Sequence, residues 1–171
     1  MDPRPFVRLP TPRAVDRPDL PPDLVGFYAW HEGAGPDDPD GDRGLYRIIR
    51  LCELAEVARI GWEGLGLATD TPEGWERFSA FRLGTGSFFS QIVYAVSAPI
   101  CPPGAILAIG GGVVELPTVL GATFPDWLAH LERCGWAEPM IESYRDFTAE
   151  ERAELYRYYR ALNPDMDLGE A

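Results

Sequence analysis

No charged side chain occurs between Leu83 and Val114, and this uncharged run limits the possible folds more than any other feature of the sequence. A membrane-spanning helix needs about 20 consecutive, mainly apolar residues. Here three prolines and the Gly-Gly-Gly segment at 110–112 interrupt the run. Because prolines and glycines break a helix of that length, the run predicts buried β-strands of a sheet core rather than a membrane span.

The run begins with Gly84-Thr85-Gly86-Ser87, a pattern that can either cradle a phosphate or turn a hairpin. A dinucleotide fingerprint needs a third glycine and then a helix, whose N-terminus meets the pyrophosphate. The third glycine is replaced by Phe89, and the following residues are aromatic and β-branched. The sequence therefore predicts a hairpin whose strands lie at 77–83 and 88–96.

Apolar periodicity and turn residues predict the remaining elements. These are, in chain order, a helix from Leu20 to His31, a strand at 45–50, a short helix at 51–58, the hairpin, a strand at 105–109, and helices beginning at Thr123 and Thr148. Thr148 and Glu151 have the spacing of a capping box, and Asn163-Pro164 ends the last helix. The strands cluster instead of alternating with helices. This order predicts an α+β fold with a central antiparallel meander sheet flanked by helices.

A length of 171 residues is typical of one domain with short extensions. Residues 1–22 contain seven prolines and four arginines. We therefore expect a Pro/Arg-rich arm at 1–18, extended and loosely attached. The α+β domain follows at 19–137, and residues 138–171 are expected to form a C-terminal helical extension packed on the same domain.

The charge balance excludes several functions. The chain has 27 acidic and 15 basic residues, a net charge of −12, and every basic residue is arginine. Schiff-base chemistry and a phosphate-binding P-loop both require lysine and are excluded. The negative charge repels nucleic acid and anionic membranes, and it favours a basic partner.

Cysteine usage and the first residues indicate a cytoplasmic protein. Cys52, Cys101 and Cys134 form no Cys-x-x-Cys pair and are odd in number, which disfavours a disulfide framework and a zinc knuckle. Residues 1–5 contain no apolar signal-peptide core. A reducing cytoplasm is the expected location.

The two histidines complete no catalytic pattern. His31 and His130 both lie on predicted helices, where a core or surface position is the usual role. A Cys–His hydrolase would need Cys52 or Cys101 beside one of them. No local motif supports that pairing, so the sequence predicts no catalytic centre.

The acidic loop after the first helix resembles a calcium loop only in part. Asp38, Asp40 and Asp42 occupy alternate positions, as calcium ligands do. The positions that require glycine and glutamate hold Arg43 and Ile49 instead. The sequence therefore predicts neither a metal nor a cofactor.

Three segments occur in a recognisable order: Leu20-Pro21-Pro22 with Phe27-Tyr28-Trp30 and His31-Glu32-Gly33, the hairpin RLGTGSFFSQIVYAV, and the helix ATFPDWLAHLE. In this order they resemble the SUKH superfamily, which includes fungal cell-wall-assembly regulators and many bacterial immunity proteins. The resemblance covers roughly residues 19–134. Two positions depart from the family pattern: Glu32 stands where Asn or Asp is frequent, and Ser87 where an acidic or amide residue often follows the hairpin glycine.

The resemblance implies an α+β domain that binds a protein and has no catalytic centre. Bacterial members often bind and neutralise a specific toxin domain. An acidic chain is suited to a basic toxin, for example a nuclease, because opposite charges accelerate association. We therefore expect a non-enzymatic immunity protein whose partner is a basic toxin domain. A scaffolding protein of the same fold without a toxin partner, and a small Cys/His hydrolase, are the alternatives.

The expected binding face combines acidic and aromatic residues. The acidic loop offers a contact surface for a basic partner. Trp62 and Trp75 flank a glycine-rich loop, where aromatic side chains often anchor interfaces, although burial in the core is an equal interpretation. The predicted partner-binding residues are Glu32, Asp37, Asp38, Asp40, Asp42, Trp62 and Trp75.

Overall fold

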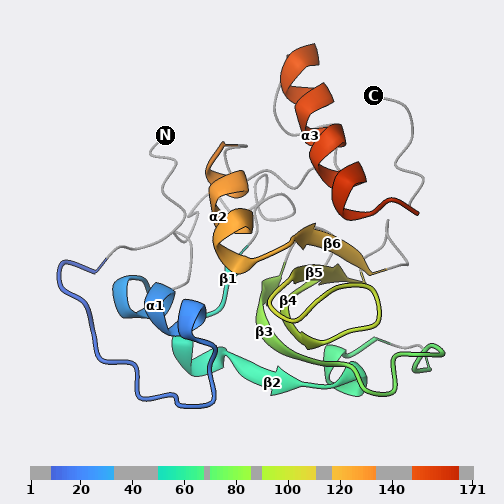
Figure 1. Ribbon diagram of the computed structural model, residues 1–171. Coiled ribbons are helices and arrows are strands. Elements are labelled where there is room, and N and C mark those ends of the chain that lie inside the picture. Colours follow the sequence, from blue (N-terminus) through green and yellow to red (C-terminus); the bar gives the residue numbers. More distant parts are fainter. Residues whose placement is uncertain are drawn as a thin grey trace, which may run out of the picture.

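The computed structural model describes residues 9–32, 50–67, 70–85, 90–110, 117–133 and 148–165. These residues form an antiparallel sheet of six strands, three α-helices and two 3-10 helices (Figure 1). The elements are α1 (Pro22–Trp30), β1 (Arg50–Leu51), η1 (Leu54–Glu56), β2 (Ala58–Ile60), η2 (Trp62–Leu65), β3 (Ser79–Thr85), β4 (Gln91–Ser97), β5 (Ile106–Ile109), β6 (Thr118–Gly121), α2 (Phe124–Arg133) and α3 (Ala149–Leu162). The predicted α+β fold with a meander sheet is confirmed.

Four consecutive strands, β3 to β6, lie side by side in the sheet, and β1 and β2 both pair with β3. The predicted hairpin is β3–β4, with Phe81 opposite Tyr94 and Arg82 opposite Val93. The uncharged run thus supplies the centre of the sheet. Among the helices of the described residues, none is both long enough and apolar enough to cross a membrane.

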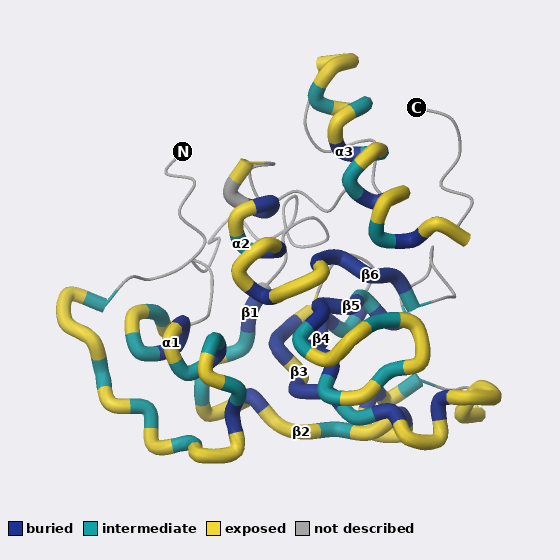
Figure 2. Tube along the Cα trace, viewed as in Figure 1, coloured by how far each residue is buried: buried dark blue, intermediate teal, exposed yellow. Residues whose placement is uncertain are grey.

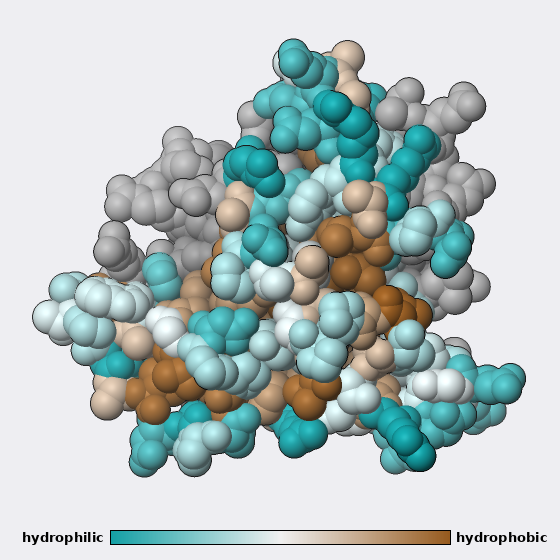
Figure 3. All heavy atoms as spheres, viewed as in Figure 1, coloured by the Kyte–Doolittle hydropathy of each residue, from teal (hydrophilic) through white to brown (hydrophobic). Residues whose placement is uncertain are grey.

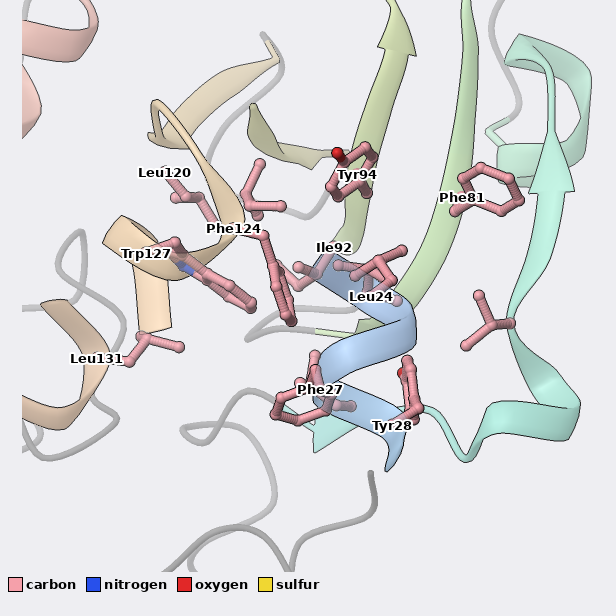
Figure 4. Close-up of a cluster of buried hydrophobic side chains, with 14 of the residues drawn as sticks. Leu24, Phe27, Tyr28, Phe81, Ile92, Tyr94, Leu120, Phe124, Trp127 and Leu131 are labelled. Atoms are coloured by element: carbon pink, nitrogen blue, oxygen red, sulfur yellow. The ribbon is translucent and has the colours of Figure 1, made fainter. Parts of the chain in front are cut away.

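One face of the sheet is covered by α1 and α2. Figure 4 shows side chains of α1, such as Phe27, and of α2, such as Phe124 and Trp127, lying between the helices and the strands. Alternate strand residues face the same side, so Ile92 and Tyr94 of β4 join this cluster. We call it the helix-side core; the rings of Phe27 and Phe124 meet edge to face at 5.3 Å.

The opposite face is covered by the connection between β2 and β3. Val93 and Ala95, the intervening residues of β4, pack there with Trp62 and Trp75. We call this cluster the tryptophan-side core. Figure 2 shows dark, buried segments along β3 to β6, as expected for a sheet covered on both faces. Burial on both sides explains why the central strands carry so few charges, since an unpaired buried charge is costly.

The described part of the N-terminal arm is hydrogen-bonded to the end of α1. The amides of Leu9 and Arg13 donate to the carbonyls of Trp30 and Ala29, at 2.9 and 2.8 Å. The Arg13 guanidinium donates to the carbonyls of Tyr28 and His31, at 2.8 and 3.1 Å. These carbonyls have no acceptor role within the helix, so the arm acts as its C-terminal cap. The expectation of a loosely attached arm is wrong from residue 9 onward.

Helix α3 packs along the outer edge of β6, the last strand of the sheet, and contacts the core clusters on both faces. Leu155 and Tyr159 belong to the helix-side core, whereas Leu162 packs against the tryptophan-side core. At the end of α3, Asn163 Oδ1 accepts a hydrogen bond from the Val119 amide at 2.8 Å, and Asn163 Nδ2 donates to the Val119 carbonyl at 2.9 Å. The side-chain amide thus takes the place of a neighbouring strand and closes the edge. Helix α3 therefore packs against both core clusters, and the domain boundary expected at 137 stays a prediction.

Two strands were not predicted, and one predicted helix is shorter. Residues 51–58 were expected to be helical, but only Leu54–Glu56 form a 3-10 helix, and β2 follows at Ala58. The strand β6 had no predicted counterpart. Of the strand expected at 45–50, only Arg50 lies within the described residues, where it begins β1. The capping box of α3 is confirmed: Thr148 Oγ1 accepts the Glu151 amide at 3.2 Å.

Candidate interaction surface

The acidic residues predicted to bind a partner are only partly described. Glu32 lies two residues after the end of α1 and is exposed. Asp37, Asp38, Asp40 and Asp42 lie outside the described residues. Their role therefore stays a prediction.

The two tryptophans predicted to bind a partner lie in the core. Trp62 and Trp75 are 8% and 7% exposed, and their ring centroids lie 5.1 Å apart. Phe78 adds a third ring, at 6.0 Å from Trp62 and 5.4 Å from Trp75. The interpretation of these tryptophans as exposed anchors is wrong; the alternative, burial in the core, is what the structure shows. They offer a partner little area but support the segments around them.

Two connections leave the sheet at the same end, and residues of both pack with the tryptophan-side core. Ser79, which begins β3, lies opposite Ser97, which ends β4. The β2–β3 connection at 61–78 and the β4–β5 connection at 98–105 are therefore neighbours. In Figure 1 the β4–β5 connection loops in the foreground, and the β2–β3 connection runs below it. This end of the sheet forms the candidate interaction surface.

The loop at 98–104 presents apolar side chains to solvent, and we call it the apolar loop. Ala98 and Cys101 form an antiparallel bridge, which leaves Pro99 and Ile100 as the two residues of a tight turn. Ile100 is 46% exposed, the largest exposure recorded for a large hydrophobic residue of the described chain. The sequence alone does not reveal this exposure, because the three prolines of the segment indicate only a break in regular structure.

The base of the apolar loop is fixed to the sheet and to α1. The amide of Gly104 donates to the carbonyl of Ala95 at 2.9 Å, with Gly104 at a φ of +95° that favours glycine. The Tyr94 hydroxyl lies beside Gly104 and donates to Asp23 Oδ1 at 3.3 Å. Burial, followed by the negative charge of Asp23, raises the pKa of Tyr94 to about 12. The phenol therefore keeps its proton and this hydrogen bond at neutral pH.

Carboxylates gather on the connection beside the apolar loop. Glu63, Asp70, Glu73 and Glu76 are all exposed. Arg77 is the single basic residue between positions 61 and 78. The apolar loop itself carries no charge. The candidate surface therefore combines the uncharged apolar loop with the exposed carboxylates of the β2–β3 connection.

Cys101 lies at the inner side of the apolar loop and packs against the tryptophan-side core. Burial raises the pKa of its thiol to about 11. A nucleophilic cysteine requires the opposite shift, because the thiolate is the reactive form. This environment disfavours a hydrolase built on Cys101.

We expect Cys101 to react slowly with alkylating reagents at pH 7.5. With a pKa of about 11, its thiolate fraction is lower than that of an ordinary cysteine by roughly a hundredfold. Iodoacetamide labelling, followed by peptide mass spectrometry, gives the rate for this cysteine alone. The same cysteine in urea-unfolded protein is the control. Labelling of the folded protein at an equal or faster rate would contradict the prediction.

His130 lies in the interface between α2 and α3 and is 4% exposed. Its ring stacks on Tyr158 at 3.8 Å and meets Tyr159 edge to face at 5.3 Å. Burial, with a smaller effect from the positive charge of Arg133, lowers the pKa of His130 to about 4. The neutral imidazole is thus a packing element. His31 is likewise stacked, on Phe27 at 4.7 Å.

We expect stability to fall as the pH drops from 7 to 5. The unfolded chain takes up a proton near pH 6.5, which the folded His130 accepts only near pH 4, so the stabilisation present above pH 6.5 is lost between these values. This residue alone lowers the free energy of unfolding by about 2 kcal/mol at pH 5, relative to neutral pH. Urea denaturation of the wild type and of His130→Phe, which keeps an aromatic ring, isolates the effect. Equal pH dependence of the two proteins would contradict it.

The described residues include no group of three or more His, Cys, Asp or Glu side chains arranged to hold a metal ion. The geometry of the described chain offers a surface, formed by a hydrogen-bonded apolar loop and a connection with exposed carboxylates. Comparison with protein-family models, with curated proteins and with solved structures finds no match for this chain, so the SUKH resemblance stays a prediction from its three sequence segments.

Proposed function

We propose that this protein is a non-enzymatic binding protein, an immunity protein that binds and neutralises a basic toxin domain in the cytoplasm. The observation that carries the proposal is the group of exposed carboxylates on the β2–β3 connection, which leaves the same end of the sheet as an uncharged loop with an exposed Ile100. Binding proteins combine these features: charge guides the approach, and an apolar centre holds the complex.

The electrostatic part of the proposal follows from the net charge. At −12 the protein attracts cationic surfaces, and a toxin that acts on nucleic acid needs such a surface for the phosphates. Steering of this kind raises association rates by about 10- to 1,000-fold at low salt. An acidic inhibitor could therefore reach the toxin before the toxin reaches its substrate.

The test uses the purified full-length chain and the product of the gene adjacent to its own. We expect a complex by isothermal titration calorimetry. In stopped-flow measurements, we expect the association rate to fall as the salt concentration is raised from about 50 to about 500 mM. Cells that produce the neighbouring protein alone should die, and cells that produce both should grow. No complex and no protection would contradict the toxin-binding function.

The same experiment separates the scaffolding alternative. A scaffold of this fold would bind a partner that is harmless to the cell, and its gene would have no large secreted toxin gene beside it. Growth that is equal with and without this chain, together with a stable complex, would support the scaffold.

A further inference from the structure

We infer that the partner docks on the apolar loop, with Ile100 as the central anchor and the acidic connection at 61–78 as one side of the rim. This inference rests on the proposed function, since it takes the partner to be a protein. It names the surface and the chemistry of the partner. It also differs from the surface predicted by sequence, which centred on the acidic loop and on two tryptophans that are buried.

The first argument is the residue at the apex of the loop. Tight turns usually hold Gly, Pro, Asn, Asp or Ser, so Pro99 is an ordinary turn residue and Ile100 is not. Here Pro99 and Ile100 form the turn, and Ile100 is 46% exposed. A β-branched apolar residue adds little to the fold at such a place. Burying it in a partner, in contrast, removes its apolar surface from water and favours binding.

The second argument is that the loop is already ordered before it meets a partner. Its bridge between Ala98 and Cys101 packs against the tryptophan-side core. The amide of Ala105 donates to the carbonyl of Pro102 at 3.3 Å, and three prolines restrict the remaining backbone. Little conformational entropy is lost when such a loop binds, so more of the contact energy appears as affinity.

The third argument concerns the chemistry of the partner. The apolar loop carries no charge, whereas Glu63, Glu73 and Glu76 on the neighbouring connection are exposed. Figure 3 shows hydrophobic residues reaching the surface at several separate places on the face in view, with hydrophilic ones along its lower edge. The complementary surface is an apolar pocket wide enough for one branched side chain and bordered by Arg or Lys. A second copy of this chain, at a net charge of −12, would bring like charges together.

The first experiment measures binding of the neighbouring gene product to the wild type, to Ile100→Ser and to Trp30→Ser. Trp30 is the matched control, because it is also a large exposed hydrophobic residue, at 42%, and lies on α1 instead of the loop. We expect Ile100→Ser to weaken binding at least about tenfold, and Trp30→Ser to change it less than about twofold. Urea denaturation of both variants checks that each is folded under the conditions of the binding measurement.

The outcomes separate this inference from the proposed function. If the wild type binds and Ile100→Ser binds equally well, the inference is overturned and the toxin-binding function stands. If Trp30→Ser abolishes binding and Ile100→Ser does not, the docking surface lies at the end of α1. If the wild type does not bind the neighbouring product, the toxin-binding function fails, and a second experiment decides the inference.

That experiment places a photo-crosslinking amino acid at position 100 or, as the control, at position 30 of the full chain in the cells that produce it. A single adduct specific to position 100, with a protein whose purified form loses at least about tenfold in affinity for Ile100→Ser, supports the inference. An adduct with a second copy of this chain, an adduct from position 30 alone, or no adduct overturns it.

Discussion

The Asn163→Leu variant is expected to lose about 3 kcal/mol of unfolding free energy, because it opens the closed edge of the sheet. The Asn163 side chain accepts the Val119 amide at 2.8 Å and donates to the Val119 carbonyl at 2.9 Å. It also donates to the Tyr159 carbonyl at 3.0 Å. Leucine matches asparagine in length but satisfies none of these groups. Each buried backbone group left unpaired costs about 1–3 kcal/mol.

Urea denaturation measures the total loss, and hydrogen exchange locates it. The Val119 amide should exchange faster in the variant relative to amides at the centre of β4, since its acceptor is the Asn163 side chain. The control is Thr148→Ala at the other end of α3, which removes the helix cap and costs about 1 kcal/mol without touching β6. A loss no larger than that of the control, with unchanged exchange at Val119, would show that Asn163 does not close the edge.

The second large effect is expected at Gly121, where β6 leads into α2. A Cβ added here would lie 2.5 Å from Trp127 Cβ and 3.1 Å from Trp127 Cα. The helix backbone cannot yield as a flexible side chain would, so Gly121→Ala must shift α2 away from the sheet. Trp127 is fully buried in the helix-side core, and the shift would loosen its packing. We expect a loss of about 3 kcal/mol.

Gly26 provides a matched control for the same chemical change. It lies in the interior of α1, is exposed, and has no heavy atom within 4 Å of an added Cβ. Gly26→Ala should therefore stabilise the protein by roughly 0.5–1 kcal/mol, because alanine favours the helix. Opposite signs for the two variants, measured by urea denaturation, are the expected result. A Gly121→Ala variant as stable as the wild type would contradict the close contact between β6 and α2.

The elements that were predicted correctly carry local or periodic patterns. The hairpin at β3–β4 has apolar strands around a glycine-rich turn, and α3 begins with a capping box formed by Thr148 and Glu151. Such patterns depend on neighbouring residues, so the sequence displays them directly. By contrast, β2 has three residues and β6 has four. Strands this short are stabilised by pairing with β3 and β5, which no local pattern records.

The candidate surface divides in the same way. The acidic balance was evident from composition, and the exposed carboxylates between positions 61 and 78 are part of it. Whether Trp62 and Trp75 faced solvent depended on what covered the second face of the sheet. In the structure these two tryptophans cover that face themselves. Ile100, in the turn of the neighbouring β4–β5 connection, is exposed instead.

By itself, the sequence determined that this chain folds around an antiparallel sheet whose strands β4 and β5 carry no charge, with capped helices, because charge, proline and glycine act locally on the backbone. Only the tertiary structure decided which residues of distant segments contact one another. In the sequence, Asn163 indicates only the end of a helix. In the structure, its side chain forms hydrogen bonds with the backbone of Val119, which is 44 residues away. The same holds for the apolar loop: its prolines predict a turn, but the exposure of Ile100 follows from how two connections meet at one end of the sheet. Long-range contacts of this kind are made by the folded chain as a whole, and no stretch of sequence contains them.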